Sequence, residues 1–529
     1  MKKLLAAILC GAMVLSLAAC GGGSESTASG TTSGGGAASG EAASGGSDTL
    51  RVINQQDPGT FDPAGVDDQS YFQVVRQIYE PLFKLNNDGT VENWLCEEYS
   101  YDDDTHLRVT LRDVQFSDGT PLTAEDVLWS LQRIRDETLP AISAIQGINF
   151  EECQVVDDKT LVIATDGPQA TLLARLAYPG TGIASKAAHE AAGGDWLNGA
   201  AIGTGPYALK EYVAGDRTEY VANENYWREG EPKVPNLQMR HITDDTTRST
   251  EARAMGADII YNINSREIEA VDAVEGVHTI EELGTNTTYL MLNSKMAPLD
   301  DPAVREAITY AINVQQTVDL IYGDFGSAGS GMVAPGVLGY DETSFQEHYG
   351  HGYDPETAKQ MLADAGYPDG IELTMLTDIG DSTRNDIAEA FQAQMAPAGI
   401  TLNIVMLENV VLYNRVAQGD QHHMVLYGLT CSDFEADGLL NQILPGSSNS
   451  KMTGFDDPHF VELINIGAST MDRTEREQAW KDALNYLAEA DVMIPVWHKA
   501  LVAAVGDNVE GFELCRDYEE HYLQGVSLS

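Results

Sequence analysis

The sequence predicts an α/β fold with mixed or parallel sheets, because strand patterns and capped helices alternate along most of the chain. Leu107, Val109 and Leu111 alternate with polar residues, as expected of a strand with one buried face. Asp301-Pro302 supplies an N-cap and a first-turn proline directly before an apolar helical stripe. No fixed-period repeat is visible, which argues against a solenoid or a propeller.

The remaining elements are predicted in the same way. Asp118-Gly119 marks a turn, and Thr123 to Asp126 resembles a capping box before a helix. Later elements, in chain order, are a helix from Asp354-Pro355 that stops at Gly366, a strand through Ile371, Leu373 and Met375, a helix through Ile387, Phe391 and Met395, strands at 401–407 and 424–429, and a last long helix capped by Thr474.

The charge balance excludes some classes of partner. The chain carries 81 acidic and 31 basic side chains over 529 residues, a formal net charge of −50 at pH 7. Such a chain lacks the basic surface that nucleic-acid phosphates or anionic lipid headgroups require. Because 43% of the residues are hydrophobic, the chain as a whole is not expected to be disordered.

Residues 1–19 are predicted to be a secretory signal peptide. A short basic start precedes the apolar stretch Leu4–Leu17, which is too short for a bilayer span of about 20 residues. The sequence Leu17-Ala18-Ala19-Cys20 resembles the bacterial lipobox, which implies cleavage before Cys20 and lipidation of its sulfur. The alternative is an ordinary signal peptide cut nearby.

Residues 20–49 contain the lipidated cysteine and a Gly- and Ser-rich stretch, which is expected to act as a flexible linker. The other cysteines of the predicted mature chain are Cys96, Cys153, Cys431 and Cys515. They form no C-x-x-C pair, so a metal cluster or redox motif is not expected, whereas one or two disulfides in any of three complete pairings are possible.

Catalytic, metal and cofactor motifs are incomplete. Gly203-Thr204-Gly205 begins like a dinucleotide fingerprint, but a turn and a strand are predicted after it in place of a helix. His189-Glu190 lacks the second histidine of a zinc motif. The adjacent pair His422-His423 would point to opposite faces of a strand and chelate poorly. No catalytic residue, metal or cofactor is therefore predicted.

Several segments along the chain form a recognisable series. They are Ile78–Leu82, Phe116–Val127, Gly203–Tyr207, Asn225–Trp227, Pro298–Arg305, Tyr353–Glu356, Ala365–Pro368 and Ala388–Ala390. The block Asp118–Val127, with the pattern D-G-T-P-x-T-A-x-D-V, is the most specific of them. In this order and spacing the segments resemble the family 5 extracellular solute-binding proteins, the oligopeptide- and dipeptide-binding lipoproteins of ABC importers.

The resemblance implies a two-lobed periplasmic-binding-protein-like fold, of type II and the large peptide-binding class. Lobe one would contain residues 50–288, with an extra subdomain at 86–202, and the returning residues 498–529. Lobe two would contain residues 289–497. Ligand would bind between the lobes, and closure about a hinge would bury it.

Binding residues are inferred from the same resemblance. Peptide-binding relatives carry a Gly-Trp segment followed by an Asp that meets the terminal ammonium of the peptide. Here Gly428-Leu429 precedes Asp433, so the Trp is replaced and Asp433 is the best candidate, with a solvated loop acid as the alternative. Further candidates are Tyr427, Thr430, Trp497, Arg384, Tyr71 and Asp68.

The sequence therefore predicts a monomeric substrate-binding protein without enzyme activity, which captures short peptides outside the cytoplasm and delivers them to an ABC permease. Its only membrane attachment would be the lipid on Cys20, at the outer face of the cytoplasmic membrane. The alternatives are a non-peptide ligand (a nickel chelate, an opine or an oligosaccharide) and a surface protein that senses peptides.

Overall fold

The computed structural model describes residues 48–66, 68–323, 327–417, 422–447, 449–516 and 522–529. The predicted signal peptide, the lipidation site Cys20 and nearly all of the predicted linker lie outside these residues. The described residues belong to one compact unit, Gly46–Ser529. None of its described helices is long and apolar enough to cross a membrane.

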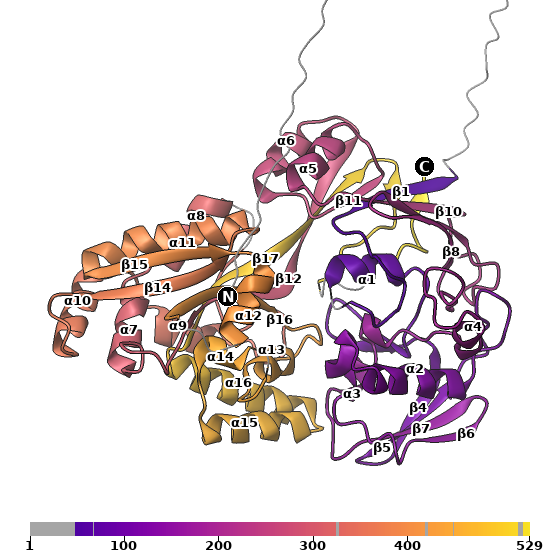
Figure 1. Cartoon of the computed structure of the whole chain (residues 1–529), viewed down its shortest axis with the longest axis horizontal. Helices are drawn as coiled ribbons and strands as arrows, with labels where there is room; N and C mark the ends of the chain where they lie inside the picture. Colours follow the sequence, from indigo (N-terminus) through magenta and orange to yellow (C-terminus); the bar gives the residue numbers. More distant parts are fainter. Residues whose placement is uncertain (1–47, 67, 324–326, 418–421, 448, 517–521) are drawn as a thin grey trace, which may run out of the picture. The chain divides into compact units, whose positions relative to one another are not determined.

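Within the described residues, the largest sheet is a mixed sheet of 11 strands. Two long antiparallel strands, β12 (Val277–Leu292) and β17 (Met493–Gly506), form its centre (Figure 1). The sheet continues beyond β12 with β16 (Met424–Thr430), β14 (Ile371–Asp378) and β15 (Ile400–Leu407). Beyond β17 it continues with β11 (Ile259–Tyr261), β1 (Thr49–Asn54), β10 (Asn236–His241), β9 (Arg217–Ala222) and β8 (Tyr207–Val213), and β13 (Ser327–Ala328) pairs with β17.

A separate antiparallel sheet lies within the predicted extra subdomain. Leu107, Val109 and Leu111 are buried on its strand β5 (His106–Leu111), as the alternation predicts. Its order is β4 (Cys96–Asp103), β5, β7 (Thr160–Ala164) and β6 (Gln154–Asp157). Two two-stranded antiparallel sheets complete the described strands: β2 (Phe83–Leu85) with β3 (Val91–Asn93), and β18 (Val509–Glu510) with β19 (Ser527–Leu528).

Helices flank the sheets. Those in the first part of the chain are α1 (Gln69–Val75), α2 (Ala124–Asp136), α3 (Leu172–Arg175), α4 (Lys186–Ala191), α5 (Asp245–Arg253) and α6 (Ile268–Asp272). Those that follow β12 are α7 (Pro302–Tyr310), α8 (Val314–Tyr322), α9 (Glu342–Tyr349), α10 (Pro355–Asp364), α11 (Ser382–Met395), α12 (Asn409–Ala417), α13 (Asp437–Ile443), α14 (Ser450–Thr453), α15 (Pro458–Ser469) and α16 (Arg473–Glu489). Short 3₁₀ helices lie at Pro140–Ile145, Pro179–Thr181, Ser265–Glu267 and Ala396–Ala398.

The predicted helix starts are mostly confirmed. Thr123 and Asp126 form a reciprocal capping box on α2, and Asp301 and Asp354 cap α7 and α10. One cap was predicted wrongly. Helix α16 begins at Arg473 because the carboxylate of Asp472 accepts from the second and third backbone N–H groups, so Thr474 lies inside the helix.

The segment from Gly203 to Tyr207 makes a close backbone contact. A Cβ on Gly203 would lie 2.1 Å from the carbonyl oxygen of Ile78, and one on Gly205 would lie 2.6 Å from that of Gln77. Tyr207 then begins β8, so a strand follows the glycines and the dinucleotide interpretation stays excluded.

Buried apolar side chains form five clusters among the described residues. Two of them consist entirely of residues between Tyr289 and Trp497. Two others combine the first part of the chain with residues after Leu501. The fifth, which we call the subdomain core, spans Ala64 to Ile183 and takes one residue from elsewhere, Phe434. The boundaries of the two lobes, with residues 50–288 and 498–529 in one and residues 289–497 in the other, remain a prediction.

Candidate ligand cavity

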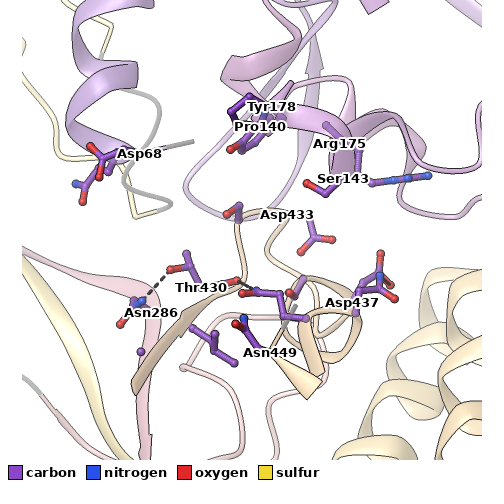
Figure 2. A pocket seen from close by; sticks show the side chains of 18 of the residues that line it. Asp68, Pro140, Ser143, Arg175, Tyr178, Asn286, Thr430, Asp433, Asp437 and Asn449 are labelled. Atoms are coloured by element: carbon purple, nitrogen blue, oxygen red, sulfur yellow. Dashed lines mark hydrogen bonds between the residues drawn. The ribbon is translucent and has the colours of Figure 1, made fainter. Parts of the chain in front are cut away.

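A cavity of about 720 Å³ lies between the two predicted lobes. Figure 2 shows side chains converging on it from both sides. It is lined by Asp68, Gln69, Pro140, Ile142, Ser143, Ala144, Gln146, Ala174, Arg175, Tyr178, Asn286, Arg384, Tyr413, Tyr427, Gly428, Leu429, Thr430, Ser432, Asp433, Asp437, Gly438, Asn441, Gln442, Asn449 and Lys499. A volume of this size suits a small organic ligand.

Five of the seven predicted binding residues line this cavity, namely Asp433, Tyr427, Thr430, Arg384 and Asp68. Tyr71 and Trp497 are not among its lining residues. Tyr71 is fully buried on α1, where its hydroxyl donates to the backbone carbonyl of Asp62. Trp497 is buried on β17 and stacks on Tyr322, with 4.1 Å between the ring centroids.

Asp433 lies in the loop between β16 and α13, and its side chain is almost completely buried. Burial raises the pKa of this carboxyl well above its usual value, and the nearby acids Asp437 and Glu435 raise it further. Glu435 is itself held by Arg476, at 2.8 and 2.9 Å. The Asp433 carboxylate accepts a hydrogen bond from the backbone N–H of Glu435, at 3.2 Å. A cation in the cavity would therefore favour the ionised carboxylate.

Asp437 is a second carboxyl group at the same end of the cavity. It accepts from Thr171 Oγ1 at 2.9 Å and from Asn441 Nδ2 at 2.7 Å. Burial raises its pKa, whereas the bond from Thr171 and the charge of Arg175 lower it. Arg175 donates to the carbonyl of Gln146, at 2.7 Å. We call Asp433 and Asp437 the acidic end; lobe one contacts it through Thr171.

A basic group of residues forms another part of the lining. Arg384 makes an ion pair with Asp381, with 3.1 Å between Nε and Oδ2, and its guanidinium lies 5.4 Å from the centre of the Tyr427 ring. Gly428 leaves room for it, because a Cβ there would lie 3.1 Å from an Arg384 terminal nitrogen. Burial lowers the pKa of Lys499, and the charge of Asp381 opposes this effect. We call Arg384 and Lys499 the basic end.

The loop that carries Asp433 is anchored in lobe one. The next residue, Phe434, has a left-handed backbone with φ of 56°, which is rare for a bulky residue. Its ring is buried in the subdomain core and packs against Gly89. A Cβ at residue 89 would lie 3.1 Å from the Cβ of Phe434, so a glycine leaves the space that this contact needs. The residue next to Asp433 is therefore held by side chains of the predicted lobe one.

Sequence reasoning missed Arg175, Asp437 and Lys499. Two of them could have been noticed in the sequence. Asp437 follows Asp433 by four residues, and Lys499 is a charged residue within an apolar strand, which is a weak indication of a functional position. Arg175 lies at the end of the single-turn helix α3, where no pattern distinguishes it.

The remaining cysteines and metal-ligating residues are not arranged as a cofactor site. Cys96, Cys153 and Cys431 are free thiols, so no disulfide joins them to one another. In the described ranges, no group of three or more His, Cys, Asp or Glu side chains is placed to hold a metal ion.

Comparison with known proteins identifies the family. The model of the bacterial extracellular solute-binding proteins, family 5 Middle, matches residues 90–451. The glutathione-binding protein GsiB of Salmonella choleraesuis (strain SC-B67) is 28% identical over 471 residues, which cover 87% of this chain and 90% of the relative. Heme-binding protein A of Haemophilus influenzae is 28% identical over 497 residues, which cover 88% of this chain and 90% of the relative.

The fold also matches that of solved structures. The ABC transporter-associated periplasmic binding protein DppA from Helicobacter pylori, in complex with the peptide STSA, has a TM-score of 0.76 at 22% identity. The match covers 91% of this chain and 98% of that one. It confirms the predicted two-lobed α/β fold of the peptide-binding class.

Proposed function

The chain belongs to the bacterial extracellular solute-binding proteins of family 5. We propose that its ligand is a short peptide. Proteins of this family are the substrate-binding proteins of ABC importers. The peptide would be captured by closure of the two lobes, passed to the permease and released unchanged, without any chemical step.

One observation carries the proposal, namely that a single cavity contains an acidic end and a basic end. Asp433 would accept the terminal ammonium of the peptide, because a buried ammonium needs a partner charge. Arg384, with Lys499, would hold the terminal carboxylate, for which a guanidinium is the best-matched donor. A zwitterionic peptide supplies a charge of opposite sign to each end, which supports the proposal.

The experiment compares peptides with free and blocked ends. Asp433→Asn is expected to weaken the binding of free-amine tripeptides by about tenfold or more, because a charged hydrogen bond is lost. Binding of the N-acetylated forms should change little. Isothermal titration calorimetry with both peptides measures the difference, and equal effects on both would reject the amine-binding role. Asp369→Asn serves as the control, because Asp369 is exposed and is not among the residues that line the cavity.

The other ligand classes predict different outcomes. Relatives named for glutathione and for heme are about equally similar to this chain. A rise in melting temperature with heme, a nickel chelate, an opine or a sugar, and none with peptide pools, would show that the ligand is that compound and not a peptide. A flat response to every small ligand, together with retention of a protein partner, would favour a sensing role.

A further inference from the structure

We propose that the cavity contains a second subsite, which binds a ligand side chain through its N–H donors. The side-chain amides of Asn441, Gln442 and Asn449 form this subsite beside the acidic end. The proposal rests on the peptide-binding function and makes it more specific. The preferred peptides would carry an amide or guanidinium side chain near the amino end.

Asn449 gives the clearest indication. It occupies the N-cap position of α14, where an Asn side chain ordinarily accepts from the first turn of the helix. Here the side chain makes no capping bond. It is 6% exposed, it lines the cavity, and its Oδ1 has no hydrogen-bond donor among the described residues (Figure 2). A buried acceptor without a donor is costly, so a ligand donor would be favoured there.

The neighbouring amides of Asn441, which is exposed, and Gln442, which is half-buried, also turn their oxygens away from bonds within the protein. Asn441 Nδ2 donates to Asp437 at 2.7 Å. Gln442 Nε2 donates to the backbone carbonyls of Thr430 and Gly438, at 2.9 and 2.5 Å. Both nitrogens are thus engaged within the protein, while in the described part of the chain no donor reaches the side-chain oxygens of Asn441 and Gln442. This wall of the cavity therefore offers acceptors.

The chemistry of the wall selects the ligand group. A guanidinium has five N–H donors and no acceptor, and a primary amide has two donors. A carboxylate has only acceptors and would lie beside the carboxyl groups of the acidic end. A thioether or an alkyl group would supply no donor to the side-chain oxygens of this wall. Sites built to hydrogen-bond a polar group reject analogues that lack it, because their own buried polar atoms are then unpaired.

Peptides of one length test the subsite in the intact protein. A series with Gln, Arg, Glu or Met as the second residue, and otherwise Ala, is titrated calorimetrically. The Gln and Arg peptides are expected to bind about tenfold more tightly than the Met and Glu peptides. Equal affinity of the Gln and Met peptides would overturn the subsite and leave peptide binding intact, whereas no binding by any peptide would reject the proposed function itself.

Two variants locate the effect. Asn449→Leu is expected to remove the preference for Gln over Met, whereas Asn449→Asp, which keeps an acceptor, should retain the preference for Arg. The control is Gln524→Leu, since Gln524 is also 6% exposed with an undonated Oε1 but does not line the cavity. A preference that survives in Asn449→Leu, or that disappears equally in Gln524→Leu, would contradict the assignment.

Discussion

Glu80 is a fully buried carboxyl group held by four side-chain donors. Thr204 and Trp94 each donate at 2.8 Å, Tyr226 at 3.0 Å and Trp227 at 3.1 Å. These bonds lower the pKa of Glu80, but burial outweighs them and raises it to about 7. Folding therefore shifts Glu80 toward its protonated form, and the four donors limit that shift.

The stability of the protein should consequently depend on pH through Glu80. A raised folded-state pKa contributes stability that is complete below the unfolded pKa, near 4.5, and is lost as the pH rises through about 7. The free energy of unfolding of the wild type, relative to Glu80→Gln, is expected to fall by up to roughly 3 kcal/mol between pH 4 and pH 8. Urea unfolding at several pH values measures this, and a pH-independent difference would contradict it.

The position of a residue that lines the cavity is easier to predict from sequence than the residues that surround it. Asp433 stood out because it follows a recognisable strand and a family motif. Its environment depends on Arg175 and Thr171, which lie more than 250 residues earlier and approach it only through the fold. Trp497 was a candidate because of its place in the sequence, but stacking on Tyr322 occupies its ring.

At the scale of elements, most helix starts were predictable because Asp-Pro pairs fix both the cap and the first turn. At α16 the sequence offers two possible N-caps, Asp472 and Thr474. The predicted cap, Thr474, was wrong because the carboxylate of Asp472 accepts the hydrogen bonds from the first turn of the helix. The order of strands in the large sheet was not predictable, since β12 pairs with β17, about 200 residues later in the chain.

The loop between β16 and α13 yields a prediction of its own. Phe434→Ala removes a ring from the subdomain core and should lower the free energy of unfolding by about 3 kcal/mol. Because the same ring connects lobe two to lobe one, peptide affinity should also fall, by about tenfold. Urea unfolding and calorimetry on the folded protein measure the two effects.

Phe391→Ala is the matched control for this loop. Phe391 is fully buried in a cluster confined to residues between Tyr289 and Trp497, so its truncation should lower stability while leaving affinity unchanged. Similar losses of affinity in both variants would show that Phe434 has no special part in connecting the lobes.

For the molecule as a whole, the sequence predicts that attachment to the membrane depends on lipidation of Cys20. We expect the wild type to fractionate with membranes and Cys20→Ser to appear in the soluble extracytoplasmic fraction, because several acyl chains are needed for stable anchoring. Cys10→Ser, within the predicted signal peptide, should fractionate as the wild type does. Membrane association of Cys20→Ser, with unchanged mass at the mature N-terminus, would contradict lipidation.

The acidic residues behind the net charge of −50 occur along the whole sequence. The lining of the cavity, by contrast, contains both acidic and basic side chains. The acidic excess therefore describes the surface more than the ligand, and the ligand must be inferred from the two ends of the cavity.

Native mass spectrometry of the protein purified without denaturation tests whether short peptides are the ligand. We expect the protein to carry additional mass that dissociates as short peptides with a free amino terminus, and this mass should exchange with added tripeptide. Recovery of heme, a metal chelate, an opine or a sugar as the bound species, with no exchange against peptides, would contradict it.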